Sequence, residues 1–281
     1  MIPINLQNRN ALVCGASKGI GKACAIRLAQ AGASVCILSR NAVLLEELLH
    51  QLPRSQNQNH HVVVANMEDP QDLEKKIHHV VLNFPIHILV NNTGGPPAGP
   101  AHTATAEAFE SAFKQHLIAN QLITSQLIAG MKEAAYGRII NIISTSVKQP
   151  IDNLGVSNTI RGAVANWAKT LANELAAFNI TVNNILPGAT RTERLESIIE
   201  KERVLHQKSQ QEIENHLLAA IPMKRFAEPE EIANAVAFLA SRLLGLRSRA
   251  SLTLTPSINL PAPGRHHTLY VHFRVCRVLC F

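Results

Sequence analysis

Short runs of consecutive apolar residues alternate along this chain with longer stretches in which apolar residues recur every three or four positions. The short runs are typical of buried parallel strands, and the longer spacing is typical of amphipathic helices. Strands are predicted at 11–14, 33–38, 61–65, 86–90, 138–143 and 180–186. Helices are predicted at 22–31, at 42–52, from 70 onward, at 105–132 and at 154–177. This alternation predicts an α/β fold, a doubly wound parallel sheet.

Glycine and polar residues gather at the predicted carboxyl ends of these strands. They are the turn at 15–21, Arg40, the loop that begins at Asn91, Ser144 and the pair Pro187-Gly188. Crossovers should be right-handed. Because the strands run parallel, their carboxyl ends share one edge of the sheet, where ligands bind. We therefore expect a single ligand-binding site along this edge.

Three glycines follow the first predicted strand at the spacing G-x-x-x-G-x-G. Gly15 allows the tight turn off the strand, Gly19 lets the backbone approach a pyrophosphate, and Gly21 lets the next helix pack closely. The free N–H groups and the dipole at the start of that helix favour an anion. An ordinary glycine-rich strand–helix turn is the alternative, but the βα repeats downstream favour a nucleotide site.

The bulk composition is that of a globular chain with one large domain or two small ones. The chain has 281 residues, and 46% of them are apolar, which is enough for a sizeable core. It contains no uninterrupted apolar run of about 18 residues, so no membrane span is expected. The first residues lack a basic region followed by an apolar run, so no secretion signal is expected.

The formal net charge of +7 is concentrated at the carboxyl end of the chain. Residues 242–281 contain no Asp or Glu and hold six arginines: Arg242, Arg247, Arg249, Arg265, Arg274 and Arg277. Such a basic segment can bind nucleic acid or a membrane, but more often it is a solvated end. We therefore expect no nucleic-acid partner and no membrane partner.

The five cysteines are spread along the chain, at Cys14, Cys24, Cys36, Cys276 and Cys280. No two of them have the spacing of a metal site, so no metal is expected. The first three fall on predicted core elements. This pattern favours reduced thiols and a cytoplasmic protein.

Four motifs in order resemble the short-chain dehydrogenase/reductase family, especially its bacterial 3-oxoacyl-acyl-carrier-protein reductases. They are the glycine turn at 11–21, Asn91-Asn92-Thr93-Gly94, the segment 183–188 that ends in Pro187-Gly188, and the segment 225–241. The resemblance runs from about residue 6 to residue 241. It implies a single Rossmann-type domain over 1–241 with a helical lid at about 190–222, and a homodimer or homotetramer.

The same resemblance implies a nicotinamide cofactor, and the charges indicate which one. An NAD site needs a carboxylate after the second strand to hold the ribose hydroxyls. This chain has Ser39 and Arg40 there, and Arg40 with Lys18 can pair a 2′-phosphate, so NADP(H) is preferred over NAD(H). Alternatively, Arg40 and Lys18 are ordinary exposed cations on loops and bind no phosphate. The expected cofactor-binding residues are Gly15, Ser17, Lys18, Gly19, Ile20, Gly21, Ser39, Arg40, Asn66, Met67, Asn92, Gly94, Pro187, Gly188 and Thr190.

The family's catalytic pattern is Asn, Ser, Tyr and Lys, and this chain keeps only the Ser, as Ser144. By spacing, His116 replaces the Asn, Ser157 the Tyr and Arg161 the Lys. A serine hydroxyl is a poor acid, and Arg161 keeps its proton near neutral pH. The expected roles are hydrogen bonds from Ser144 and Ser157 to a developing alkoxide, stabilised by Arg161, with a water-borne proton relayed by His116. Alternatively, His116 is an ordinary helix-face residue and Ser157 an ordinary polar residue at a helix start.

Two functions follow from this comparison. The first is an NADPH-dependent oxidoreductase that reduces a carbonyl, 3-oxoacyl-like substrate with a non-standard proton donor. The second is a catalytically inactive NADP(H)-binding pseudo-enzyme, acting as a sensor or partner subunit. The retained Ser144 and the nucleotide features favour the first, and the absent Tyr and Lys favour the second.

Two stretches in the last third of the chain bear on the substrate and on the end of the sheet. The stretch Thr190 to Ile221 is predicted as a helix with an apolar face, suited to a small-molecule or acyl-thioester substrate or to an oligomer contact. Residues 250–254 can form a last strand. The basic segment 242–281 otherwise diverges from the family, and its tail, 261–281, is predicted to be disordered.

Overall fold

A seven-stranded parallel sheet forms the centre of the protein, in the order β3-β2-β1-β4-β5-β6-β7. The computed structural model describes residues 4–242 and 251–254. The strands are β1 (Asn10–Cys14), β2 (Ser34–Ser39), β3 (His61–Val64), β4 (Ile88–Asn91), β5 (Gly137–Ile142), β6 (Ile180–Pro187) and β7 (Ser251–Leu254). The order reverses between β1 and β4, so the predicted doubly wound parallel sheet is confirmed.

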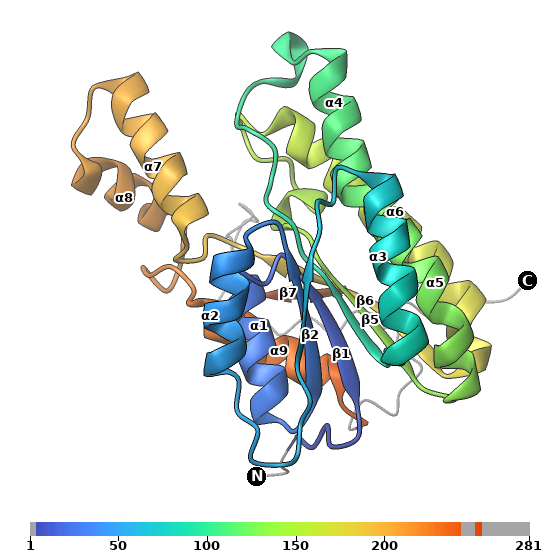
Figure 1. Ribbon diagram of the computed structural model, residues 1–281. Helices are drawn as coiled ribbons and strands as arrows, with labels where there is room; N and C mark the ends of the chain where they lie inside the picture. Colours follow the sequence, from blue (N-terminus) through green and yellow to red (C-terminus); the bar gives the residue numbers. More distant parts are fainter. Residues whose placement is uncertain (1–3, 243–250, 255–281) are drawn as a thin grey trace, which may run out of the picture.

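Helices cover both faces of the sheet (Figure 1). One face carries α1 (Gly19–Gln30), α2 (Ala42–Gln51) and α9 (Pro229–Ala240), and the other carries α3 (Pro70–Asn83), α5 (Ala119–Glu133) and α6 (Gly155–Leu175). Within the described part of the chain, no helix is long and apolar enough to cross a membrane.

Alternate residues of β1 supply the two cores. Ala11 and Val13 pack with α1, α2 and α9, whereas Leu12 and Cys14 pack with α3, α5 and α6. This follows from the two-residue period of a strand. Because both faces are covered, the strand is apolar from Ala11 to Cys14, as parallel strands usually are. Fully burying a leucine such as Leu12 contributes about 1.5–3 kcal/mol.

The helix predicted at 105–132 is continuous but not uniform. It consists of α4 (Ala106–Phe113), a π-helical stretch (Lys114–Ile118) and α5. The Thr105 hydroxyl begins it by accepting a hydrogen bond from the Ala108 amide at 3.3 Å. The wider π turn was not predicted, because such stretches leave no strong pattern in the apolar spacing. They are frequent at functional sites.

The single helix predicted at 190–221 is wrong, because two helices occupy this stretch. They are α7 (Glu193–His206) and α8 (Gln210–Ala219). Gln207 ends α7 with a left-handed φ of 52°, and Ser209 and Glu212 form a capping box that starts α8. The pair stands off from the sheet in Figure 1 and has its own small core. This core consists of Leu195, Ile199, Ile213, Ile221 and Phe226.

The strand predicted at 250–254 is present as β7. It pairs in parallel with β6, with Asn184 opposite Ser251 and Pro187 opposite Leu254. The disorder predicted for 261–281 lies outside the described residues, as does most of the basic segment 242–281.

Three buried asparagines form a ladder across neighbouring strands. Asn91, Asn141 and Asn184 are in register on β4, β5 and β6. The Asn91 amide donates to the Asn141 side chain at 2.9 Å, and the Asn141 amide donates to Asn184 at 3.0 Å. These two bonds compensate the side chains of Asn141 and Asn184 for leaving water, whereas the buried Asn91 Oδ1 has no partner among the described residues. The ladder holds three strand ends at a common height.

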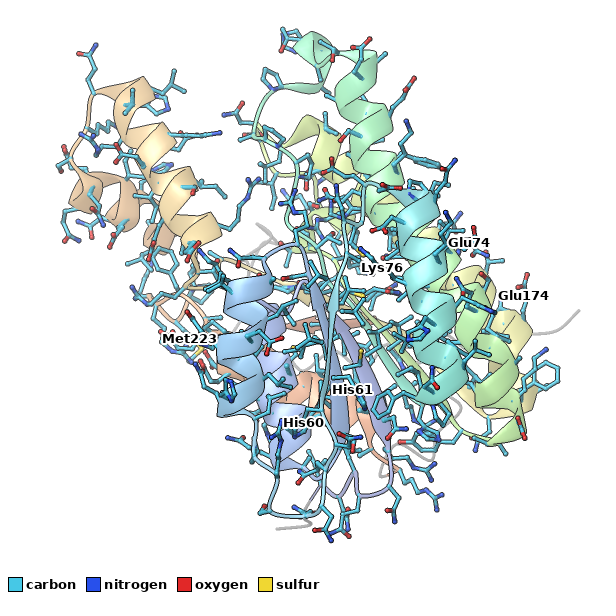
Figure 2. All side chains as sticks on the ribbon, viewed as in Figure 1. His60, His61, Glu74, Lys76, Glu174 and Met223 are labelled. Carbon is cyan, nitrogen blue, oxygen red and sulfur yellow. The ribbon has the colours of Figure 1, made fainter. Side chains whose placement is uncertain are left out.

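A buried histidine lies directly before β3, the outermost strand on one side of the sheet. His60 precedes β3 and lies low on the sheet in Figure 2, beside His61. Its Nδ1 accepts from the Val35 amide at 3.0 Å, so its Nε2 carries the proton and donates to the Pro53 carbonyl at 2.9 Å. Burial, chiefly, lowers the pKa of His60. This histidine is a satisfied structural residue.

The three cysteines in the described part of the chain are free thiols in the core, as predicted. They are Cys14, Cys24 and Cys36. Burial raises the pKa of each, that of Cys36 to about 12. These thiols are therefore protonated and unreactive at neutral pH.

Candidate functional site

The glycine turn is a tight backbone cradle between β1 and α1. Gly15 and Gly19 have left-handed φ values of +60° and +53°. A Cβ on Gly21 would lie 2.1 Å from the Gly15 carbonyl oxygen and 2.7 Å from the Asn92 amide nitrogen. The Asn92 amide donates to the Cys14 and Gly15 carbonyls at 3.3 and 3.2 Å. The predicted turn is therefore present, and Asn92 braces it from the β4 loop.

The remaining predicted residues of the turn lie around the start of α1. Ser17 is half-buried within the turn, and Ile20 packs against the core. Lys18 is exposed, and its Nζ lies 2.8 Å from the carboxylate of Glu193, at the start of α7. The Thr192 methyl group lies 3.1 Å from the Cβ position of Gly19. The base of the α7–α8 unit thus touches the glycine turn, a contact that sequence reasoning missed.

The ends of β2 and β3 lie beside this turn at the same edge. Ser39 is buried, and its hydroxyl accepts from the Asn41 amide at 3.3 Å. Arg40 is exposed and makes no ion pair with any described residue. After β3, Met67 is buried, and the Asn66 oxygen accepts from the Glu68 amide at 3.1 Å. Only Arg40 in this group offers a free charge to a ligand.

The segment after β6 completes the edge. Pro187 ends the strand in a buried position, and the Thr190 hydroxyl donates to the Gly188 carbonyl at 3.1 Å. Thr190 also bridges to Ala227, and the backbone of Arg191 donates to the Ala227 carbonyl at 2.8 Å. These bonds fix the two ends of the α7–α8 unit to each other just beyond the end of β6.

Ser144 lies immediately after β5. It is half-buried, and its hydroxyl oxygen accepts from the Ser146 amide at 3.1 Å. Because that bond uses only an acceptor position, the Ser144 O–H remains a donor for another group.

Ser157 and Arg161 lie one turn apart on α6, so their side chains share a face of the helix. Arg161 is buried, and its Nη1 donates to the carbonyls of Ile142 and Ile143, each at 3.0 Å. This ties α6 to the end of β5, directly before Ser144. Ser157 is also buried. The structure thus brings Arg161 to the end of β5 beside Ser144, and Ser157 lies one turn earlier on the same face of α6.

His116, the fourth predicted catalytic residue, lies in the π-helical stretch. Its Nδ1 is 2.6 Å from the Thr93 hydroxyl, and its buried Nε2 has no hydrogen-bond partner among the described residues. Burial, and secondly the charge of Arg161, lower the pKa of His116 to about 3, against a smaller opposing effect of the Gly94 carbonyl. His116 is therefore neutral at physiological pH and lies near Arg161 and Gly94.

Arg194, near the start of α7, was not singled out by sequence reasoning. Its Nη2 donates to the Pro96 carbonyl at 2.7 Å and reaches the same loop as Arg161. Burial, and secondly Arg194, lower the pKa of Arg161 to about 10. No spacing rule links positions 161 and 194; the only signal was the presence of two arginines after Pro187-Gly188.

Known proteins resemble the whole described fold. The chain is 31% identical over 238 residues to the NADPH-dependent reductase BacG of Bacillus subtilis, covering 84% of this chain and 92% of BacG. It is 31% identical over 243 residues to the 3-oxoacyl-[acyl-carrier-protein] reductase FabG of Aquifex aeolicus, covering 85% and 93%.

A solved structure of L-sorbose reductase from Gluconobacter frateurii, complexed with NADPH and L-sorbose, is also similar. It is 25% identical, with a TM-score of 0.86, and the match covers 92% of this chain and 98% of that one. A solved NADPH-dependent reductase involved in bacilysin biosynthesis, YwfH, is 28% identical, with a TM-score of 0.83 and coverages of 90% and 99%.

The glycine cradle and these relatives agree with the match to a sequence family. The family described as short chain dehydrogenase matches residues 9–203. Because this match spans well over half of the chain, the protein belongs to the short-chain dehydrogenase family of oxidoreductases.

Proposed function

We propose that this protein is an NADPH-dependent reductase of a carbonyl, 3-oxoacyl-like substrate. The observation that carries the proposal is the glycine cradle, in which Gly21 packs so closely on Gly15 and Asn92 that no side chain fits. Beyond it, a Cβ on Gly94 would meet nothing within 4 Å, so the edge is open to a ligand. Relatives that use NADPH support the choice of cofactor.

The residues present fit NADPH from one end to the other. The backbone of Ser17, Lys18 and Ile20 would bind the pyrophosphate at the start of α1. Arg40 would pair the 2′-phosphate, since no carboxylate stands after β2 to repel it. Met67, with Asn66, would border the adenine, and Asn92, Gly94, Pro187, Gly188 and Thr190 would line the nicotinamide end.

NADPH supplies the hydride that the substrate's carbonyl carbon accepts. The chain's own task is to stabilise the oxygen on which negative charge then develops. Ser144 and Ser157 donate hydrogen bonds to that oxygen, and the Arg161 charge stabilises it. One such donor contributes roughly 3–4 kcal/mol to the transition state.

The alkoxide takes its proton from water, because no acidic side chain stands in for the family's tyrosine. His116 is neutral, so it carries one N–H and one acceptor nitrogen and can only pass a proton on. The product is then the alcohol, and water is left as hydroxide until it is buffered. We infer that the reaction is slow compared with an enzyme that uses a positioned acid.

A second function rests on a specific observation. The two Nη1 hydrogen bonds of Arg161 go to backbone carbonyls, which is a structural role that needs no substrate. A pseudo-enzyme that binds NADP(H) as a sensor or partner subunit would keep this arrangement. It would bind the cofactor and reduce nothing.

The α7–α8 unit would serve as the lid over the substrate in either case. Its exposed apolar residues Val204 and Leu205 suit a hydrophobic substrate or a second copy of the chain in a homodimer or homotetramer.

The test combines binding with turnover. Calorimetry should register tighter binding of NADPH than of NADH, and NADPH oxidation should depend on an added 3-oxo substrate, tested both as an acetoacetyl thioester and as free acetoacetate. Ser144→Ala should lower kcat at least about 100-fold. The matched control is Ser146→Ala, because the Ser146 hydroxyl is buried without a partner among the described residues. Binding without any turnover supports the sensor, and absence of binding to either nucleotide contradicts both functions.

A further inference from the structure

Two arginine side chains from different elements converge on one point above Gly95. A Cβ on Gly95 would lie 3.7 Å from the Nη2 atom of Arg161 and 3.5 Å from the Nη2 atom of Arg194. Arg161 comes from the middle of α6, and Arg194 comes from the start of α7. The fold therefore brings two like charges together, which repel each other unless an anion lies between them.

Neither guanidinium is neutralised by a carboxylate of the described residues. None of the ion pairs within residues 4–242 includes Arg161 or Arg194, and the hydrogen bonds of both go to backbone carbonyls. Arg161 is only 9% exposed, and a charge removed from water costs several kcal/mol unless it is paired. Burial, and secondly the charge of Arg194, lower the pKa of Arg161. A buried charge without a counter-ion indicates that a ligand supplies one.

Two glycines, Gly94 and Gly95, leave a gap in side-chain cover where the two guanidiniums meet. Gly95 has no side chain, and its nearest non-neighbouring atoms are these two arginines. A Cβ on the preceding residue, Gly94, would meet nothing within 4 Å. Arg161 also binds the backbone directly before Ser144, so the gap lies beside the proposed reacting serines.

We propose that Arg161 and Arg194 bind a carboxylate of the substrate, so that the substrate is a small free oxo acid. This inference rests on the proposed function, because it names the substrate class of the same site. Two guanidinium groups offer paired N–H donors that match the two oxygens of a carboxylate. A neutral thioester or ester would leave both charges uncompensated. The carboxylate would hold the molecule while its carbonyl group faces Ser144 and Ser157.

The test is a calorimetric titration of the full chain, alone and with NADPH, using acetoacetate and its uncharged methyl ester. The parent should bind acetoacetate at least about tenfold more tightly than the ester. Arg194→Gln should raise the Kd for acetoacetate by about tenfold and change the Kd for the ester by less than about twofold. Arg194→Lys keeps the charge and should recover part of the loss.

Arg191→Gln is the matched control, since Arg191 lies just before α7, three residues from Arg194, but pairs with Glu228 at 3.2 Å. It should leave both Kd values unchanged. Equal Kd values of the parent for acid and ester overturn the proposal. So does an equal rise in the Kd for acetoacetate in Arg194→Gln and Arg191→Gln. So does inorganic phosphate that binds as tightly as acetoacetate and is displaced by NADPH, because the pair would then belong to a cofactor phosphate.

Failure of NADPH to bind contradicts the proposed function alone. The titration without nucleotide still decides whether the two arginines bind a carboxylate.

Discussion

The two sides of the ligand-binding edge are built from different materials. Beside β1 the site is backbone, shaped by Gly15 and Gly21, and the one cation of the turn, Lys18, is exposed and paired with Glu193. Beside β5 the site is made of side chains, and its cation, Arg161, is buried without a carboxylate among the described residues. A backbone cradle serves any nucleotide, whereas a buried side-chain cluster is specific to one chemistry. The first side therefore indicates the family, and the second side distinguishes this member.

The largest effect is expected from the backbone side. Gly21→Ala would place a methyl group 2.1 Å from the Gly15 carbonyl, so either the turn or α1 must shift. We expect a loss of about 3 kcal/mol of unfolding free energy, as for severe overpacking, and NADPH binding weakened beyond detection. Thermal unfolding and calorimetry measure the two effects.

Gly130→Ala is the matched control, because a Cβ on Gly130 in α5 meets nothing within 4 Å. It should leave NADPH binding intact and change stability by no more than about 1 kcal/mol, in the stabilising direction. Equal nucleotide affinity in both variants would show that the close approach at Gly21 does not shape the cradle.

An intermediate effect is expected beside β5, where burial of His116 should make the free energy of unfolding depend on pH. The pKa of His116 is about 3 in the folded chain, below the ordinary value of 6.5, so the unfolded chain binds more protons between these values. The contribution of neutral His116 to the free energy of unfolding is complete above about pH 6.5 and is lost as the pH falls toward 3. Between about pH 7 and pH 5 the loss is about 2 kcal/mol. Urea unfolding at the two pH values measures it.

His116→Asn removes this titration and should reduce that loss by most of its value. His102→Asn, at an exposed histidine, should leave it unchanged. If both variants keep the parent's acid sensitivity, other groups govern it, and His116 is not held neutral by its surroundings.

The smallest effect is expected where the two sides meet. Glu193→Gln breaks the ion pair with Lys18. The Lys18 and Glu193 side chains are 52% and 65% exposed, so the free energy of unfolding should change by less than about 0.5 kcal/mol. The freed Lys18 can pair a phosphate, so the Kd for NADPH should fall by about twofold to threefold. Glu196→Gln, one turn along α7, is the control. An unchanged Kd would mean that Lys18 does not face the nucleotide.

The sequence was sufficient for the sheet, because the period of apolar residues reports burial directly. The glycine turn was predictable for the same local reason, since glycine adopts the left-handed backbone of Gly15 and Gly19 at the lowest cost. The break in the lid was missed, although two local signals mark it. No apolar residue occurs between Leu205 and Ile213, and Ser209 with Glu212 has the spacing of a capping box. Arg194 was missed because its meeting with Arg161 depends on how α7 enters the site, which no local pattern contains.

The asparagine ladder has a mechanical consequence for anything that closes on this edge. Its hydrogen bonds run in one direction, from Asn91 through Asn141 to Asn184, and each needs its donor and acceptor opposite each other. A strand that slid along its neighbour would break such a bond in a place that water does not reach. The loops after β4, β5 and β6 therefore share a rigid floor, and any adjustment to a ligand must come from above, where α7 and α8 stand.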